Sequence, residues 1–451
     1  MRFEKMTKVI ALTGAVAMAF GLAGCGGSGS GSSASGKGGK TEILVWSWDS
    51  TLPRTVKGFE AKNPDIKVKV TNVGTNKKEY TALNNALSAN KGAPDLAQVE
   101  YYALPEYATQ DKLQDLSDMG ASGYKSFYTP GTWDSVNLNG GVYALPMDSG
   151  PMALFYNKEV FDKAGVTEVP TTWDEYYEAA KKIKAVGSYI TSDSGDAGFF
   201  DSMTWQAGAK PFATSKDGKT VTINLTGDPK VKKWDDYWQK MINEDLINTK
   251  IPGWSDDWNK GLNDGSIASL LTGAWMPYNL LSGAPDASGK WRVAQMPTWE
   301  KGGTENSENG GSSLAMIKTK DDSKSKAAYK FLEYACHNAE GIKTRVDGGA
   351  FPADNNTLKS NEFLSMTSLK DANGKDNAYF GGQKFNEVLS QAAKNVLPGY
   401  KFLPFEVYAR GIYGDKMTAF TSKSATLDQG IAAWQKDLQN YAKQQGYTVK
   451  K

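Results

Sequence analysis

The sequence contains few of the residues that build metal centres, disulfide frameworks and histidine-dependent active sites. Among its 451 residues there are one histidine, His337, and two cysteines, Cys25 and Cys336. A histidine-rich zinc site and a Ser-His-Asp triad would both depend on His337, which lies on a predicted helix that looks structural. Cys336 follows the apolar positions of this helix, so we predict that it is a small buried hydrophobic residue. No cofactor and no metal site are expected.

Charge of one sign is not in excess either. The chain carries 52 basic and 50 acidic side chains, which gives a formal net charge of +2. Nucleic-acid-binding proteins usually display a positive surplus, so no nucleic-acid partner is expected. A near-neutral, solvated surface instead fits a neutral ligand.

The N-terminus has the pattern of a secretory signal. Basic residues precede the apolar stretch from Val9 to Leu22, which is too short to span a membrane comfortably. The tetrapeptide that ends at Cys25 looks like a bacterial lipobox, which implies a signal peptide over residues 1–24 and lipidation of the Cys25 thiol. Residues 25–40 would then hold the lipid-bearing cysteine and a flexible Gly/Ser-rich tether on the extracellular face of the membrane. The alternative is a plain signal with a coincidental cysteine.

Strand and helix patterns alternate at the start of the predicted fold. Buried or alternating apolar runs predict strands over residues 43–46, 66–70 and 95–99, and amphipathic spacing predicts helices over 52–63 and 77–90. This order is typical of a parallel α/β lobe. Ligands of such sheets sit at the carboxyl ends of the strands, so Trp48, Asp49, Glu100 and Tyr101 are expected to project toward one edge.

A strand that stops and restarts marks the passage to a second lobe. Residues 142–145 and 152–156 have strand signatures, and Pro146, Gly150 and Pro151 break the pattern between them. Asn157 is a plausible cap for the helix that follows. Thr172 and Glu175 form a predicted capping box for the next one.

The order Tyr143-Ala144-Leu145-Pro146, Phe155-Tyr156-Asn157-Lys158 and Pro170-Thr171-Thr172-Trp173 resembles the central segment of the substrate-binding lipoproteins of carbohydrate ABC importers. These belong to the extracellular solute-binding protein family 1 and are similar to maltose-binding protein. The run from Thr272 to Met276 resembles the family signature in which a strand ends in Gly and Trp and the indole lies against a sugar ring.

The resemblance covers essentially the whole mature chain and implies a two-lobe, type II periplasmic-binding-protein fold. Parallel-rich sheets flanked by helices would be joined by a hinge of several crossover segments. Residues 41–150 and 312–365 would form the N-terminal lobe, and residues 151–311 and 380–451 the C-terminal lobe. The third boundary is expected between residues 366 and 395.

The chain is rich in aromatic residues, at 11% with 13 tryptophans, and several stand beside polar residues at strand ends. Flat rings suit the C–H faces of a sugar, and planar polar groups suit its hydroxyl edges. We therefore expect the ligand to contact Trp48, Asp49, Glu100, Tyr101, Asp148, Phe200, Trp205, Gln206, Trp254, Trp275, Asn309, Gly310, Phe351 and Tyr408, the last two mainly by their position in the resemblance. Each aromatic residue could instead pack in a core, and each Asp or Glu could instead cap a turn.

The predicted function is that of an extracellular, monomeric binding component of an ABC importer. It would capture a neutral oligosaccharide between two closing lobes and deliver it to the membrane permease. Two alternatives stay open. A membrane-anchored glycoside hydrolase also needs carboxylates near aromatics, although no carboxylate pair stands out. A binding protein for a peptide, a polyamine or a metal complex is the other.

Overall fold

The computed structural model describes residues 39–371 and 373–450. The predicted signal peptide, Cys25 and nearly all of the Gly/Ser-rich tether lie outside the described residues. None of the helices in the described ranges is long and apolar enough to cross a membrane.

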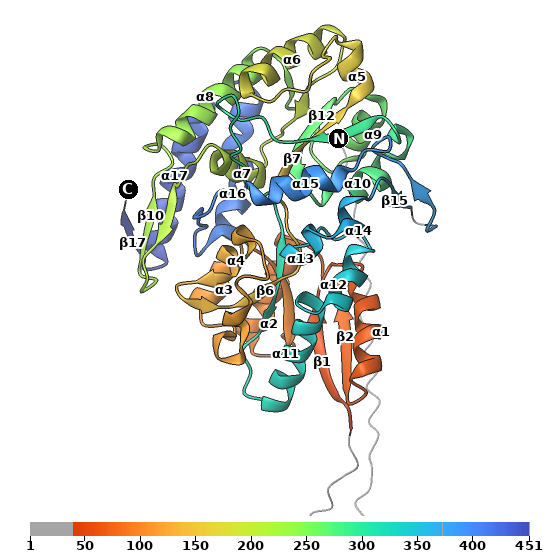
Figure 1. Cartoon of the computed structure of the whole chain (residues 1–451). Helices are drawn as coiled ribbons and strands as arrows, with labels where there is room; N and C mark the ends of the chain where they lie inside the picture. The colour runs from red at the N-terminus through yellow and green to blue at the C-terminus, as the bar shows by residue number, and fades with distance from the viewer. Residues whose placement is uncertain (1–38, 372, 451) are drawn as a thin grey trace, which may run out of the picture. The chain divides into compact units, whose positions relative to one another are not determined.

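A five-stranded sheet forms the first lobe, in the lower half of Figure 1. Its order is β2 (Ile66–Thr71), β1 (Thr41–Trp46), β3 (Leu96–Glu100), β14 (Ser312–Met316) and β6 (Ala144–Pro146). β1 is parallel to β2 and β3, whereas β14 is antiparallel to its neighbours β3 and β6. The alternation of strands and helices predicted for residues 43–99 is confirmed. β14, which comes after β7, β12 and β13 in the sequence, returns to this sheet.

Helices and short elements surround this sheet. They are α1 (Leu52–Lys62), α2 (Lys77–Ala89), α3 (Leu104–Thr109), η1 (Ser117–Met119), η2 (Ala121–Tyr124), α4 (Pro130–Val136), β4 (Asn137–Leu138), β5 (Gly141–Val142), α11 (Asp322–Cys336) and α12 (Ala339–Val346). Apolar side chains of these elements and of the sheet form one buried core. Cys336 is buried within it, as predicted from its place on an apolar helix face.

The second lobe is built around β7 (Met152–Asn157), which is antiparallel to β12 (Ser269–Gly273) and β13 (Trp291–Ala294). A hairpin of β9 (Phe212–Thr214) and β10 (Thr220–Ile223) pairs with β17 (Thr448–Lys450), and β8 (Thr191–Ser192) pairs with β11 (Ile247–Asn248). The helices are α5 (Lys158–Lys163), α6 (Trp173–Ala185), α7 (Ala197–Gln206), α8 (Pro229–Asn243), α9 (Asp256–Asp264), α10 (Met276–Gly283), α15 (Phe385–Lys394), α16 (Glu406–Thr421) and α17 (Leu427–Gln444).

Capping interactions begin the two helices that the sequence marked most clearly. The Asn157 side chain accepts a hydrogen bond from the Val160 amide at the start of α5. Thr172 and Glu175 form a capping box at the start of α6, with each side chain bonded to the other residue's backbone. Both caps were predicted and both are present.

Two further cores fill the second lobe. One lies among β7, α6, α7, α8, α16 and α17, and the other lies beneath α9, α10 and α15. The stretch from Phe351 to Phe363 touches both lobes. It contains α13 (Asn355–Leu358) and most of α14 (Asn361–Leu364). The chain then continues to β15 (Leu369–Lys370) and β16 (Asp376–Asn377). Phe351 and Phe363 pack in the core beneath α10, whereas Ala353 packs in the core of the first lobe.

Two chain segments cross between the lobes side by side. We call residues 148–151 the first crossover and residues 307–311 the second crossover. The Asn309 amide donates to the Gly150 carbonyl at 2.8 Å, and the Met152 amide donates to the Ser307 carbonyl at 2.9 Å. A Cβ at Gly150 would lie 2.2 Å from the Asn309 oxygen, so only glycine allows this approach. The predicted two-lobe α/β fold with a multi-segment hinge is confirmed.

Candidate ligand-binding site

The indole of Trp275 is fixed to the second crossover. β12 ends at Gly273, and two residues later Trp275 donates its Nε1–H to the Asn309 carbonyl oxygen at 2.7 Å. A Cβ at Gly273 would lie 2.3 Å from that nitrogen, so the glycine is needed to seat the indole. The strand-end Gly and Trp of the sequence pattern therefore place a rigid ring where the lobes join.

The side chain of Trp254 lies beside Trp275 and is exposed to solvent. Its relative exposure is 58%, and it is the one large hydrophobic side chain in the described ranges that is exposed. Its ring stacks on Trp275 with centroids 5.7 Å apart and packs against Trp258 at 5.2 Å. Its φ of +67° is rare for a bulky residue. We call the paired rings the Trp254–Trp275 platform.

Rarely populated backbone conformations persist only where the surrounding structure enforces them, and they cluster at ligand-binding sites. The Trp254–Trp275 platform is both exposed and anchored. It can therefore supply a flat apolar face to a ligand at the junction of the two lobes.

Polar residues of the first lobe gather at the carboxyl edge of its sheet, as the strand order predicts. The Gln98 side-chain oxygen accepts hydrogen bonds from the amides of Trp48 and Asp49. The phenol of Tyr101 donates to the Asp148 carbonyl at 2.6 Å and so ties the end of β3 to the first crossover. The structure thus brings these strand-end residues to one edge of the sheet, where Tyr101 meets the first crossover.

The carboxylates at this edge are already engaged within the protein. Asp49 pairs with the buried Arg345 at 3.1 Å and also accepts the Thr51 amide at the start of α1. Asp148 accepts hydrogen bonds from the backbone and hydroxyl of Ser312. Burial raises the pKa of Asp148 to about 6, against the opposing charge of Arg345. Asp49 and Asp148 therefore stabilise the conformation of the loops at the carboxyl edge of the sheet.

A further carboxyl group, that of Glu308, is buried on the second crossover. It accepts a hydrogen bond from the Ser149 hydroxyl at 2.9 Å, and its other oxygen has no partner among the described residues. Burial raises the pKa of Glu308 to about 7; the Ser149 bond opposes this rise and the charge of Asp148 adds to it. The two crossovers are thus joined by a carboxyl group that is easily protonated.

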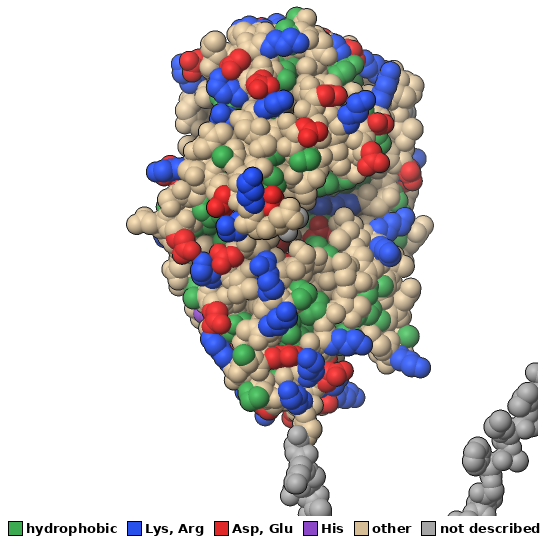
Figure 2. Space-filling model, turned by 90° about the vertical axis from the view of Figure 1, so that its right-hand side faces the viewer, with side chains coloured by type: hydrophobic (Ala, Val, Ile, Leu, Met, Phe, Trp, Pro, Cys, Tyr) green, Lys and Arg blue, Asp and Glu red, His purple; other side chains and the backbone are tan. Residues whose placement is uncertain are grey.

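An inter-lobe cavity of about 700 Å³ opens beside α2, α7 and α16. The first lobe contributes Asn76, Tyr80, Tyr102 and Glu106, and the second contributes Asp196, Tyr408, Arg410 and Tyr441. We call this space the cleft cavity. Viewed from the side that carries α9, α10 and β15, the surface is also hollowed between the lobes, with charged and apolar side chains inside the hollow (Figure 2). Burial raises the pKa of Glu106 to about 7 and raises that of the nearby Glu100, which accepts the Tyr80 hydroxyl.

Arg410 joins the two lobes at the inner end of this cavity. Its guanidinium donates to Asp201 at 2.9 Å, and its central carbon lies 3.9 Å from the centre of the Tyr102 ring. Arg410 and Tyr102 also line a narrow crevice shared with Tyr101 and Gly310. Because Gly310 lies against the Trp275 indole, contacts run from the platform to the cleft cavity.

Several predicted site residues lie away from this surface. Phe200 is 2% exposed and packs against Tyr413 and Trp434 in the second lobe. Gln206 is buried and bonded to the Trp173 indole and to two carbonyl oxygens. Both face inward because α7 is buried along most of its length.

The remaining aromatic candidates, Trp205, Phe351 and Tyr408, pack against other aromatic rings. Trp205 is 6% exposed, stacks on Tyr400 with centroids 4.9 Å apart, and lines the crevice. Phe351 packs against Phe363 beneath α10. Tyr408 stacks on Tyr441 in the wall of the cleft cavity. The site candidates thus divide between the platform, the first-lobe edge, the cleft cavity, the crevice and the interior.

Sequence reasoning missed Arg345, Arg410 and Glu308. Each is a single charged residue whose burial depends on contacts with residues far away in the chain, so no local pattern marks it. A weak signal existed for Glu308 alone, which directly precedes the predicted Asn309 and Gly310. The described ranges contain no cluster of three or more His, Cys, Asp or Glu side chains suited to a metal ion.

Residues 46–339 match the bacterial extracellular solute-binding protein family. The chain belongs to this family. It is a family of binding proteins rather than enzymes, and its members act outside the cytoplasm, as the sequence resemblance implied.

Individual relatives agree with this assignment. The arabinooligosaccharide-binding protein of Bacillus subtilis strain 168 is 30% identical over 355 residues, which cover 75% of this chain and 78% of that protein. The solved ABC-transporter-associated binding protein from B. animalis subsp. lactis Bl-04, in complex with beta-1,6-galactobiose, is 58% identical with a TM-score of 0.82. The galacto-N-biose-/lacto-N-biose I-binding protein of Bifidobacterium longum, in complex with lacto-N-biose, is 26% identical with a TM-score of 0.76. Each of these two matches covers 92% of this chain and 100% of the other.

Proposed function

We propose that this solute-binding protein is the extracellular binding component of an ABC importer and captures a neutral oligosaccharide between its lobes. Relatives of this chain bind oligosaccharides, and the 58% identical structure holds a galactobiose. The structural observation that carries the proposal is the Trp254–Trp275 platform, an exposed indole stacked on another that is bonded to the second crossover. The closed protein would deliver its ligand to the membrane permease.

The platform would stack on the C–H face of one sugar ring. Trp48, Glu100 and Tyr408 would offer further ring faces and hydrogen-bonding edges, while Tyr101, Asp49 and Asp148 keep the first-lobe edge in place. Unpaired buried polar groups cost about 1 to 3 kcal/mol each, so a sugar with misplaced hydroxyls would be rejected.

Ligand contacts from both lobes imply that binding and lobe closure are coupled. A sugar shifts the population toward the closed form only by its difference in affinity for the two forms. We propose that residues 41–147 with 312–350 move as one body and residues 152–306 with 364–450 as the other. Residues 351–363, which pack on both cores, would flex with the two crossovers.

Calorimetric titration against defined oligosaccharides, starting with β-1,6-galactobiose, tests the function. We expect saturable binding, a raised melting temperature and no sugar cleavage by chromatography after prolonged incubation. Cleavage products would favour the hydrolase alternative. Absence of binding across plant, host and starch-type sugars would contradict the proposal.

We propose that Cys25, outside the described residues, carries the lipid that anchors the protein, which would act there as a monomer. Two or more acyl chains hold a protein at a membrane stably, whereas one does so only marginally. In a bacterial host, labelled fatty acid should enter the wild-type protein and a Cys336→Ser control. It should not enter Cys25→Ser, which should be released into the medium; labelling of Cys25→Ser would refute the anchor.

A further inference from the structure

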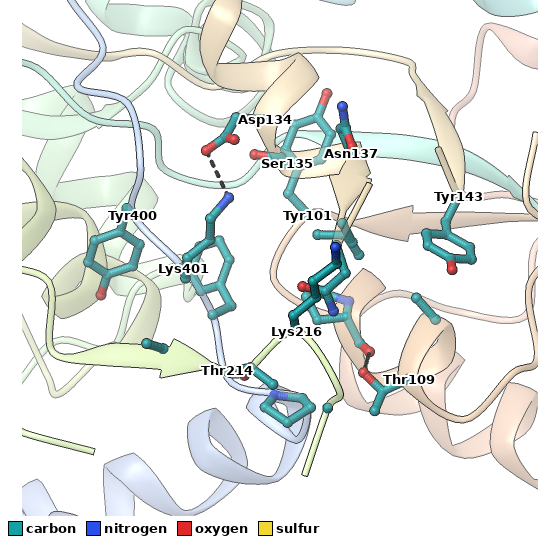
Figure 3. Close-up of a pocket in the computed structure, with 18 of the residues that line it drawn as sticks. Tyr101, Thr109, Asp134, Ser135, Asn137, Tyr143, Thr214, Lys216, Tyr400 and Lys401 are labelled. Atoms are coloured by element: carbon teal, nitrogen blue, oxygen red, sulfur yellow. Dashed lines mark hydrogen bonds and ion pairs between the residues drawn. The ribbon is translucent and has the colours of Figure 1, made fainter. Parts of the chain in front are cut away.

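A second inter-lobe cavity of about 440 Å³ shares no lining residue with the cleft cavity or with the Trp254–Trp275 platform. Figure 3 shows it in close-up. The first lobe supplies α3, α4 and the chain from Asn137 to Tyr143, and the second lobe supplies the β9–β10 hairpin and residues 400–404. We call this space the hairpin cavity.

The hairpin cavity lies next to the hinge. Tyr101 and Phe402 line both the hairpin cavity and the narrow crevice that reaches Gly310. Tyr101 is also bonded through its hydroxyl to the first crossover at Asp148. A molecule in this cavity would therefore touch a residue that is fixed to the crossovers.

The walls combine aromatic rings with polar groups of balanced charge. The rings are those of Tyr101, Tyr143, Tyr400 and Phe402, and the polar groups include Asn137, Asn139, Asp134, Asp217, Lys216 and Lys401. Two ammonium groups face two carboxylates, so the cavity has no net charge to attract a phosphate. Its lining contains no histidine or cysteine. Its two carboxylates are balanced by two lysines, which makes it a poor site for a metal ion.

The charged groups are not equally engaged. Lys401 pairs with Asp134 across the two lobes at 2.9 Å, as the dashed line in Figure 3 shows. Asp217 accepts hydrogen bonds from Ser215 and from the Lys219 amide. Lys216 has no ion-pair partner among the described residues, although the tip of its hairpin lies close to Thr109 of α3. The ammonium of Lys216 is therefore available to a ligand hydroxyl.

We propose that the hairpin cavity is a second binding site, for a single neutral sugar ring. Sugar ring faces would lie against Tyr143 and Phe402, the partly exposed aromatic side chains of the wall, and hydroxyls would bond to the asparagine amides and to Lys216. The volume falls within the range of about 300 to 1,000 Å³ that is usual for small-molecule sites.

Both lobes form the walls of the hairpin cavity, so its occupancy is linked to the lobe arrangement. A bound ring stabilises the arrangement in which the hairpin faces α3 and α4. By linkage, it changes the affinity for sugar at the platform by the same factor as platform sugar changes the affinity of the hairpin cavity. The site would thus adjust oligosaccharide capture.

The test is a ligand-detected NMR titration of the full protein with D-galactose, with and without saturating β-1,6-galactobiose. We expect saturable galactose binding that persists when the platform is occupied. Lys216→Met should weaken it by about ten-fold or more, the effect of losing one hydrogen bond to a charged group. Lys219→Met, on the same hairpin but outside the cavity, should leave it unchanged.

Three outcomes would overturn the second site: no saturable galactose signal, complete displacement of galactose by galactobiose, or equal effects of the two lysine substitutions. Tighter binding of inorganic phosphate than of galactose would overturn its neutral character. If galactobiose itself fails to bind, the proposed function fails, but the dependence of galactose binding on Lys216 still decides this site.

Discussion

Trp275 donates its indole N–H to the carbonyl oxygen of Asn309 at 2.7 Å, so a ring of the second lobe is bonded directly to a segment that crosses to the first. A ring held in this way loses little conformational freedom when a ligand arrives. Because the same bond attaches the platform to the second crossover, a relative motion of the lobes would also move the platform.

Gly311→Ala should displace Tyr101. Gly311 has a φ of +86°, and a Cβ there would lie 2.7 Å from the Tyr101 ring. We expect a loss of about 1 to 2 kcal/mol from the left-handed backbone and a further 1 to 3 kcal/mol from the clash. Denaturant unfolding measures both. Gly140→Ala, with a φ of +95° and open space around the Cβ, should show only the first loss; equal losses would contradict the clash.

Arg345→Met should strongly destabilise the first lobe. Arg345 is buried beside Asp49 and near Asp148, so its removal leaves uncompensated buried negative charge. We expect a loss of about 3 to 5 kcal/mol in the free energy of unfolding. Arg54→Met, on the exposed face of α1, is the matched control and should change little. Adding Asp49→Asn to Arg345→Met should recover part of the loss.

Glu308→Gln should change how stability depends on pH. Burial raises the pKa of Glu308 from 4.5 to about 7, so between these values the folded protein holds a proton that the unfolded chain releases. The contribution of this group is therefore full below pH 4.5 and is lost as pH rises through 7. Across this window wild type should lose up to about 1.4 kcal/mol per pH unit relative to Glu308→Gln. Parallel profiles of unfolding free energy from pH 5 to 8 would show that Glu308 is ionised in the folded protein.

Cys336 should resist thiol reagents in the native protein. It is 1% exposed, and burial raises the pKa of its thiol to about 12, so neither access nor thiolate is available. In a Cys25→Ser protein, a colorimetric thiol reagent should detect about one thiol in strong denaturant and almost none before unfolding. Rapid labelling without denaturant would mean that α11 opens readily.

The sequence predicted those parts of the fold that local rules control. The strands and helices of residues 41–100 follow from periodicity, and the caps at Asn157 and Thr172 follow from hydrogen-bonding residues at fixed spacing. The fold of the first lobe then places the ends of β1 and β3 at one edge. Topology alone therefore brought Trp48 and Tyr101 to the same edge of the sheet.

Side-chain direction within buried helices could not be predicted in the same way. Phe200 and Gln206 belong to α7, which is buried nearly all round and mixes polar with apolar residues, so no periodic face distinguishes interior from cleft. The Asp49–Arg345 pair joins residues almost 300 positions apart, and Arg410 meets Tyr102 only when both lobes are folded. Such contacts depend on the tertiary structure and leave no mark in short sequence windows.

The most direct test of the sugar-binding account is a calorimetric titration of β-1,6-galactobiose into wild type, Trp254→Phe and Trp254→Ala. Trp254 is exposed, so neither substitution should lower the melting temperature of the free protein appreciably. If the platform stacks on the sugar, Trp254→Ala should weaken binding by about ten-fold or more, roughly 1.4 kcal/mol, and Trp254→Phe by much less. Equal dissociation constants for all three proteins would contradict the account.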